Sequence, residues 1–181
     1  MEEKEFSWVR EIISTAVYLL AVVAVTFLFV QFVGQRTHVN GDSMNVTLED
    51  GDNLIVDKLS YRFSEPERYD IIVFPYQYQE KTYYIKRIIG MPGETVDIKN
   101  GVVLLNGSVL DEEYYDGTTA PTDSTVSYPV TVADNCVFVM GDNRPRSKDS
   151  RSSDLGLVPY DALLGKAQVR IWPLTEISIT R

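Results

Sequence analysis

Residues 95–107, TVDIKNGVVLLNG, contain three short segments divided by two Asn-Gly pairs. The pairs are Asn100-Gly101 and Asn106-Gly107. Asn-Gly readily supplies the two positive φ angles that a two-residue hairpin turn requires. We therefore expect an antiparallel meander here, with residues 102–105 as its middle strand.

Apolar runs of strand length lie on both sides of this meander. They occupy residues 53–56, 71–74, 83–89, 168–172 and 176–180. Residues 114–128 are rich in Asp, Thr, Ser, Gly and Pro, which predicts a surface loop. Short strands without long helical patterns predict a mostly β domain, built as a coiled sheet or a barrel-like structure.

One segment before the β domain has a different character. Residues 12–33 form a run of 22 residues without a charged side chain. A helix of that length reaches ~33 Å, enough to cross a hydrocarbon core of about 30 Å. We expect a transmembrane anchor at residues 12–33. The alternative is a cleaved secretory signal, but its apolar part is only about 7–15 residues long and ends in a small-x-small site. Residues 31–35 offer no such site.

The charges that flank this run predict its orientation. Lys4 and Arg10 precede it, and Arg36 follows closely. Because Lys and Arg concentrate on the cytoplasmic side, we expect residues 1–11 in the cytoplasm and residues 34–181 outside it, as one extracytoplasmic domain.

Composition excludes several classes of function. The chain of 181 residues carries a formal net charge of -9 and has no basic run, which argues against a nucleic-acid partner. It has one cysteine, Cys136, and one histidine, His38. A zinc site would need more such ligands, so we expect neither a metal nor another cofactor.

Common serine-nucleophile schemes fit the sequence poorly. His38 lies five residues before Ser43, ~17 Å along an extended chain, so a Ser-His-Asp triad would need the chain to fold back. Residues 41–45, GDSMN, lack the second glycine of a nucleophile elbow. A serine paired with a lysine base is the scheme that is left.

Lys86 has the sequence context that a lysine base needs. Such a lysine must be neutral, and burial among apolar groups lowers its pKa. Strand alternation puts Tyr84, Lys86 and Ile88 on one face and Arg87 on the other. From the residues alone, two other interpretations stay open: a solvated lysine on an edge strand, and a serine that serves only its turn.

Four segments in order resemble the conserved boxes of type I signal peptidases. They are residues 41–48 (GDSMNVTL), 52–63, 84–94 (YIKRIIGMPGE) and 141–151 (GDNRPRSKDSR), the last continuing to residue 159. The short segment between the last two boxes resembles the compact Gram-positive type. The resemblance implies a membrane-anchored Ser/Lys endopeptidase. Its partners would be the lipid bilayer and the signal peptides of exported preproteins, which are cut after a small-x-small site, usually Ala-x-Ala.

The resemblance also assigns catalytic roles. Ser43 would attack the scissile carbonyl, and Lys86 would take its proton and later protonate the leaving amine. Ser147 would hold Lys86 by a hydrogen bond. The oxyanion would rest on backbone N–H groups, foremost that of Ser43, because Gly41 stands where some members have a serine that helps to bind it.

Further residues are assigned to the support of the site. The resemblance implies ion pairing for Asp142, Asp149 and Arg151, with Arg87 as the expected partner of Asp142, and implies that Met44 packs beside the nucleophile. Many members have a proline where this chain has Val46, which would leave the turn less pre-organised.

Three other interpretations compete with this one. A self-cleaving repressor would use a similar Ser/Lys pair, but it is soluble and carries a DNA-binding domain. A non-catalytic tethered β domain would not need Ser43, Lys86 and Ser147 together. A role in pilus assembly, rather than general secretion, is left open by Val46.

Overall fold

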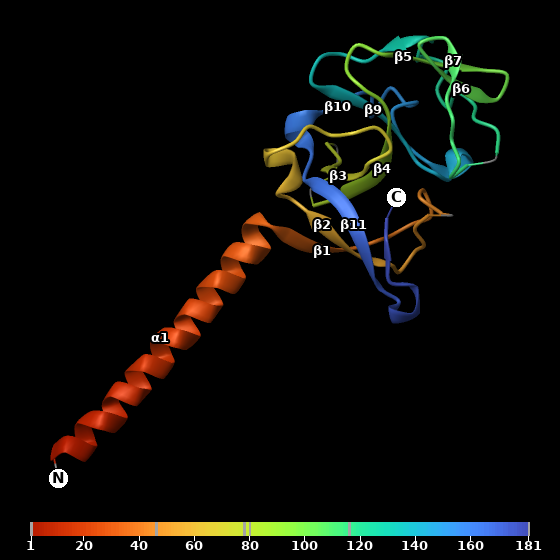
Figure 1. Ribbon diagram of the computed structural model, residues 1–181. Coiled ribbons are helices and arrows are strands. Elements are labelled where there is room, and N and C mark those ends of the chain that lie inside the picture. The colour runs from red at the N-terminus through yellow and green to blue at the C-terminus, as the bar shows by residue number, and fades with distance from the viewer. Residues whose placement is uncertain (1, 46, 78, 80, 116, 181) are drawn as a thin grey trace.

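The computed structural model describes residues 2–45, 47–77, 79, 81–115 and 117–180. One long helix, α1 (Glu2–Phe32), projects away from a body of strands (Figure 1). The strands are β1 (Gly34–His38), β2 (Asn53–Asp57), β3 (Ile71–Pro75), β4 (Tyr83–Gly90), β5 (Thr95–Lys99), β6 (Val102–Leu105), β7 (Ser108–Val109), β8 (Val130–Thr131), β9 (Cys136–Met140), β10 (Val158–Pro159), β11 (Gly165–Trp172) and β12 (Ser178–Ile179). Four 3-10 turns accompany them, η1 (Ser60–Arg62), η2 (Arg144–Arg146), η3 (Tyr160–Ala162) and η4 (Leu174–Glu176).

The strands form two sheets, which confirms the predicted mostly β fold. The larger sheet has the order β1-β2-β11-β3-β4-β9-β10, with β12 paired to β11. The smaller sheet has the order β7-β6-β5-β8 and lies at the far end of the body from α1 (Figure 1). Within the described residues neither sheet closes on itself, so the domain is built of coiled open sheets and not of a closed barrel.

The predicted meander forms the core of the smaller sheet. Strands β5 and β6 pair antiparallel, with Lys99 opposite Val102, and β6 pairs with β7. Both Asn-Gly pairs have positive φ, at 52° and 83° for residues 100 and 101 and at 51° and 85° for residues 106 and 107. The turn chemistry of the sequence therefore sets the register of these three strands.

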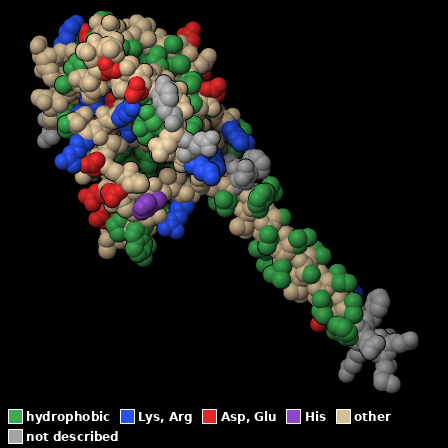
Figure 2. Space-filling model, turned by 180° about the vertical axis from the view of Figure 1, so that it is seen from behind, with side chains coloured by type: hydrophobic (Ala, Val, Ile, Leu, Met, Phe, Trp, Pro, Cys, Tyr) green, Lys and Arg blue, Asp and Glu red, His purple; other side chains and the backbone are tan. Residues whose placement is uncertain are grey.

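Helix α1 is longer than the predicted anchor. It begins at Glu2, ten residues before the uncharged run, because Glu and Lys are good helix formers that need no apolar environment. Residues Trp8–Val30 within it have a mean hydropathy of 2.5 and are not buried against the rest of the protein. Hydrophobic side chains cover its visible surface (Figure 2). The helix is long and apolar enough to cross a bilayer, and β1 follows it almost directly.

Strand β3 is buried on both faces, which explains its continuous apolar run. Ile71 and Val73 pack into one hydrophobic cluster, and Ile72 and Phe74 pack into another on the opposite side. The neighbouring strand β4 lies between β3 and β9, in the interior of the larger sheet. Lys86 therefore does not lie on an edge strand.

The C-terminal strands differ in extent from the prediction. Strand β11 starts at Gly165, three residues early, because Gly165 and Lys166 also pair with β3. Strand β12 covers only Ser178–Ile179, after the turn η4.

Candidate active site

Ser43 lies in a tight turn after β1. Gly41 opens the turn with a φ of 98°, and the N–H of Asn45 donates to the carbonyl of Asp42 at 3.1 Å. Met44 is buried in the hydrophobic cluster below with Leu48, as the resemblance implies. Burial of Met44 fixes the turn, and Ser43 lines an open cleft of about 500 Å³.

The Lys86 amine contacts this serine directly. Its Nζ lies 2.7 Å from Ser43 Oγ and donates to the carbonyl of Ile85 at 2.8 Å. Only 3% of Lys86 is exposed. Ile72 stands opposite it on β3, and the Tyr84 ring lies 5.1 Å from Nζ. The structure thus joins a serine and a lysine that lie 43 residues apart in the sequence.

Burial changes the acid-base behaviour of this lysine. Desolvation lowers the pKa of Lys86 from 10.5 to about 8, although the carboxylates of Asp149 and Asp142 act in the opposite direction. The positive charge of Arg151 contributes a further lowering. A group with a pKa near 8 is half neutral at that pH, so the amine can accept a proton under mild conditions.

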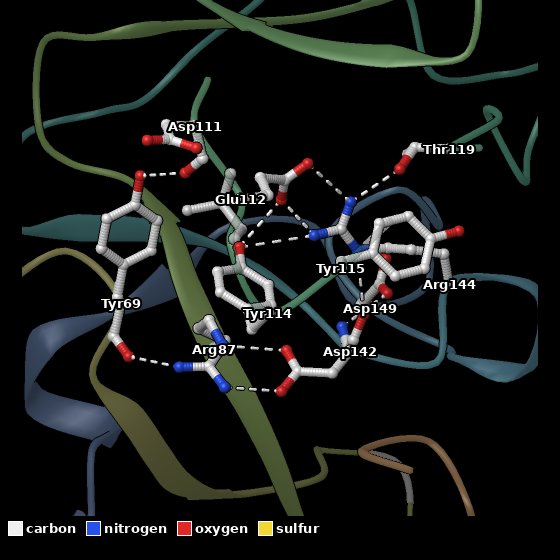
Figure 3. A network of polar contacts seen from close by, with 12 residues as sticks. Tyr69, Arg87, Asp111, Glu112, Tyr114, Tyr115, Thr119, Asp142, Arg144 and Asp149 are labelled. Carbon is white, nitrogen blue, oxygen red and sulfur yellow. Dashed lines mark hydrogen bonds and ion pairs between the residues drawn. The ribbon is translucent and has the colours of Figure 1, made fainter. Parts of the chain in front are cut away.

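The predicted pairing of Arg87 with Asp142 is present (Figure 3). Arg87 Nε and Nη2 donate to the two carboxylate oxygens of Asp142 at 2.9 and 2.6 Å, and both side chains are 1% exposed. Thr47 donates a further hydrogen bond of 2.5 Å to Asp142, and the Tyr114 ring lies 4.1 Å from the guanidinium carbon. The pair therefore has no direct access to water.

Asp149 and Arg151 form a second buried pair. Arg151 Nε and Nη2 each lie 2.8 Å from a carboxylate oxygen of Asp149. Asp149 also accepts the N–H of Gly141 at 3.0 Å, and Arg151 donates to the carbonyl of Arg144 at 2.7 Å. These contacts close residues 141–151 into a rigid loop beside Lys86.

Ser147 lies in this loop, but its expected hydrogen bond is not formed. Its Oγ is buried without a partner among the described residues, and Lys86 Nζ donates to Ile85 instead. Gly141 lies close by. A Cβ at Gly141 would collide with Ser147 Oγ and with the carbonyl oxygen of Ser43. The loop and the Ser43 turn can therefore meet only because residue 141 has no side chain.

Sequence reasoning missed a third ion pair, between the buried Arg144 and the partly buried Glu112 (Figure 3). Arg144 also donates to Thr119 Oγ1 at 2.6 Å and to the carbonyl of Gly141 at 3.0 Å. Its guanidinium lies 4.5 Å from the Tyr115 ring centroid. Arg144 belongs to the last box, so its place in that motif could have indicated a role in the site. Glu112 belongs to no motif, and the adjoining segment was predicted to be only a surface loop.

Two other positions that the sequence singled out can be placed or set aside. His38 lines the same cleft at the end of β1, but among the described residues the side-chain partner of Ser43 Oγ is Lys86. Val46 lies outside the residues that the structure describes.

The chain is similar to known signal peptidases in sequence. The model of the family "Signal peptidase, peptidase S26" matches residues 9–172. The probable signal peptidase I-2 of Synechocystis is 40% identical over 153 residues, covering 82% of this chain and 67% of that protein. The signal peptidase I of Bacillus licheniformis is 36% identical over 181 residues, 97% of this chain and 92% of the other. A signal peptidase I crystal structure from Enterococcus faecalis has 34% identity and a TM-score of 0.45, covering 57% of this chain and 97% of that one.

Asp142→Asn is expected to destabilise the fold as well as lower activity, because it leaves the Arg87 charge buried without a counter-ion. Loss of one partner of a buried pair costs about 3–5 kcal/mol, and thermal unfolding of the full chain in detergent measures it. Asp154→Asn is the control, because the Lys148–Asp154 pair is solvent-exposed and such pairs contribute only about 0–1 kcal/mol. Unchanged stability of Asp142→Asn with lost activity would make the carboxylate catalytic rather than structural.

Proposed function

We propose a Ser/Lys mechanism for this chain, which belongs to the signal peptidase family, peptidase S26. Membership in that family makes it a serine protease that removes signal peptides. The finer proposal is that Ser43 is the nucleophile, that Lys86 is its base, and that cleavage follows a small-x-small site such as Ala-x-Ala.

The observation that carries the proposal is the contact of 2.7 Å between Lys86 Nζ and Ser43 Oγ inside an apolar environment. The neutral amine donates one hydrogen to the Ile85 carbonyl, which leaves its lone pair free to accept the serine proton. Ser43 Oγ then attacks the scissile carbonyl carbon. The protonated Lys86 returns its proton to the leaving amine, and a water molecule is deprotonated in the same way to release the acyl group.

Two neighbouring groups complete the proposed chemistry. The backbone N–H of Ser43 is the proposed donor to the oxyanion, since Gly41 has no hydroxyl to offer. Ser147 Oγ is buried and has no hydrogen-bond partner among the described residues. We assign it to Lys86, because catalytic hydrogen bonds often tighten only when substrate is bound.

The cleft suits an extended peptide. Its walls are residues 37–44, from the end of β1 into the Ser43 turn, residues 81–86, which include the first half of β4, and the side chains of Arg146 and Lys148. Strand β1 is the outermost strand of the larger sheet, so a substrate could add to the backbone beside it as another strand. The side chains nearest the scissile bond would then be held in shallow pockets, which favours small residues.

The family and the apolar helix α1 support a membrane-anchored enzyme. We propose residues 12–33 as the anchor, residues 1–11 in the cytoplasm and residues 34–181 as the extracytoplasmic domain. The cleavage site of a preprotein emerges from the bilayer on that side. The family match argues against a self-cleaving repressor. A role restricted to pilus assembly would differ from general secretion in which preproteins are cleaved.

The proposed specificity can be tested by incubating the full chain in detergent with a preprotein that carries Ala-x-Ala. Sequencing of the new N-terminus should place the cut directly after the second alanine. Replacing that alanine by phenylalanine should block cleavage, because a shallow pocket cannot admit the ring. Cleavage that proceeds equally well with phenylalanine would contradict the small-x-small rule, and Ser43→Ala serves as the inactive control.

The pH profile tests the base. Because the pKa of Lys86 is lowered to about 8 and only its neutral form accepts a proton, kcat/KM should rise about tenfold per pH unit below that value and level off above it. Lys86→Arg should be inactive but folded, since guanidinium stays protonated.

Two variants control this experiment. Lys99→Arg makes the same change at an exposed lysine and should keep full activity. His38→Ala removes the single imidazole of the chain and should keep the same pH profile. Substantial cleavage by Lys86→Arg, or loss of the pH dependence of kcat/KM in His38→Ala, would contradict the Ser/Lys mechanism.

Orientation can be tested on intact cells stripped of their wall. External protease should digest residues 34–181 and leave an N-terminal tag protected until the membrane is permeabilised. Protection of the catalytic domain in unpermeabilised cells would reverse the proposed topology.

A further inference from the structure

Asn143 holds the nucleophile turn by two hydrogen bonds to successive carbonyls. Its backbone N–H donates to the carbonyl of Ser43 at 3.0 Å, and its side-chain Nδ2 donates to the carbonyl of Asp42 at 2.9 Å. Asn143 comes from the loop after β9, about a hundred residues further along the chain. The two donors form a fork that fixes both the position and the tilt of the turn.

The fork itself is held rigidly, because both chain neighbours of Asn143 are in buried ion pairs. Asp142 is bound to Arg87 and Arg144 is bound to Glu112, each through two nitrogen–oxygen contacts (Figure 3). Each of these three side chains, Asp142, Arg87 and Arg144, is 1% exposed. Asn143 therefore cannot shift without breaking a desolvated pair, which costs several kcal/mol.

These contacts close a ring of residues that includes Ser43 and Lys86. Ser43 contacts Lys86, Lys86 is bonded to Arg87 in the chain, and Arg87 pairs with Asp142. Asp142 is bonded to Asn143, which returns to Ser43. Two of the five links are covalent, and the other three are short polar contacts. Serine and lysine are thus placed by their ties to residues 142 and 143 as well as by their mutual contact.

From this ring we propose that Asn143 is a positioning residue, which sets the Ser43 hydroxyl in line with the Lys86 amine. The inference rests on the proposed Ser/Lys mechanism and deepens it. Its physical basis is that proton transfer and attack require near-contact geometry, and a misplacement of about 1 Å can lower a rate ~100-fold. The amide hydrogen donated to Asp42 supplies this placement, whereas the bulk of the side chain does not.

Two substitutions separate the hydrogen bond that Asn143 donates to the Asp42 carbonyl from the volume of its side chain. Asn143→Ala removes the donor and the volume, and Asn143→Asp keeps the volume but turns an oxygen toward the Asp42 carbonyl. We expect kcat to fall about tenfold in Asn143→Ala, the equivalent of one lost hydrogen bond, and about a hundredfold in Asn143→Asp, with KM changed less than about twofold. Both are measured on the full chain over the whole pH profile, so that kcat is compared on the alkaline plateau of each variant, together with the thermal midpoint.

Asn45→Ala is the matched control. It is the same chemical change in the same turn, but the Asn45 side chain is exposed, and among the described residues the hydrogen bond of Asn45 is that of its backbone N–H to Asp42. It should keep kcat within about twofold, because no placing contact is lost. Wild-type kcat in Asn143→Asp, or a milder loss there than in Asn143→Ala, would mean that Asn143 only fills space and would overturn the proposal.

Asn143→Gln decides the question if Asn143→Ala and Asn143→Asp fail to fold. It keeps the amide but displaces it by one methylene, so a position-sensitive fork predicts a loss in kcat of at least about fivefold with an unchanged thermal midpoint. Wild-type turnover by Asn143→Gln would overturn the inference. Failure of the underlying mechanism is distinguished separately, because Ser43→Ala and Lys86→Arg would then retain cleavage whatever Asn143 does.

Discussion

The desolvation of one lysine is the constraint on which the rest of the site depends. Lys86 can act as a base only where its charged form is disfavoured, so it lies in the interior of a sheet with Ile72 and Tyr84 beside it. A free carboxylate at that depth would restore the positive charge. Asp142 and Asp149 do stand near and raise the pKa of Lys86, but each is paired with an arginine, Arg151 acts against them, and desolvation outweighs their effect. The two aspartates of the last box are therefore each held in an ion pair that carries no net charge.

This requirement also explains why the smaller sheet contributes to a site that it does not enter. Arg144 supports the loop that meets the Ser43 turn, and a buried guanidinium needs a counter-charge. Glu112 provides it from the segment between β7 and β8, while Thr119 and Tyr115 complete the surroundings of Arg144 (Figure 3). A segment that looks like a solvated loop is thus a structural part of the active site.

Features of the fold that depend on a few neighbouring residues could be predicted from the sequence. The Asn-Gly pairs predicted the meander, and strand alternation put Arg87 on the face opposite Lys86, where it meets Asp142. Contacts that depend on the path of the whole chain could not be found in this way. Glu112 has no sequence signal, and the fork from Asn143 depends on where two distant loops meet. The absence of a hydrogen bond from Ser147 Oγ to Lys86 among the described residues is a result of packing. The start of α1 at Glu2 is a result of helix propensity, which the uncharged run does not encode.

The direct passage from α1 into β1 gives the anchor a function beyond attachment. Phe32 ends the helix, Gly34 begins the strand, and Ser43 follows after eleven residues from the helix end, with no flexible linker between. Because β1 is hydrogen-bonded along its length to β2, this stretch cannot lengthen or coil. The proposed nucleophile is therefore held at a set distance from the point where the helix ends. With the proposed anchor in the bilayer, this connection sets the distance from the membrane at which a peptide bond can reach Ser43.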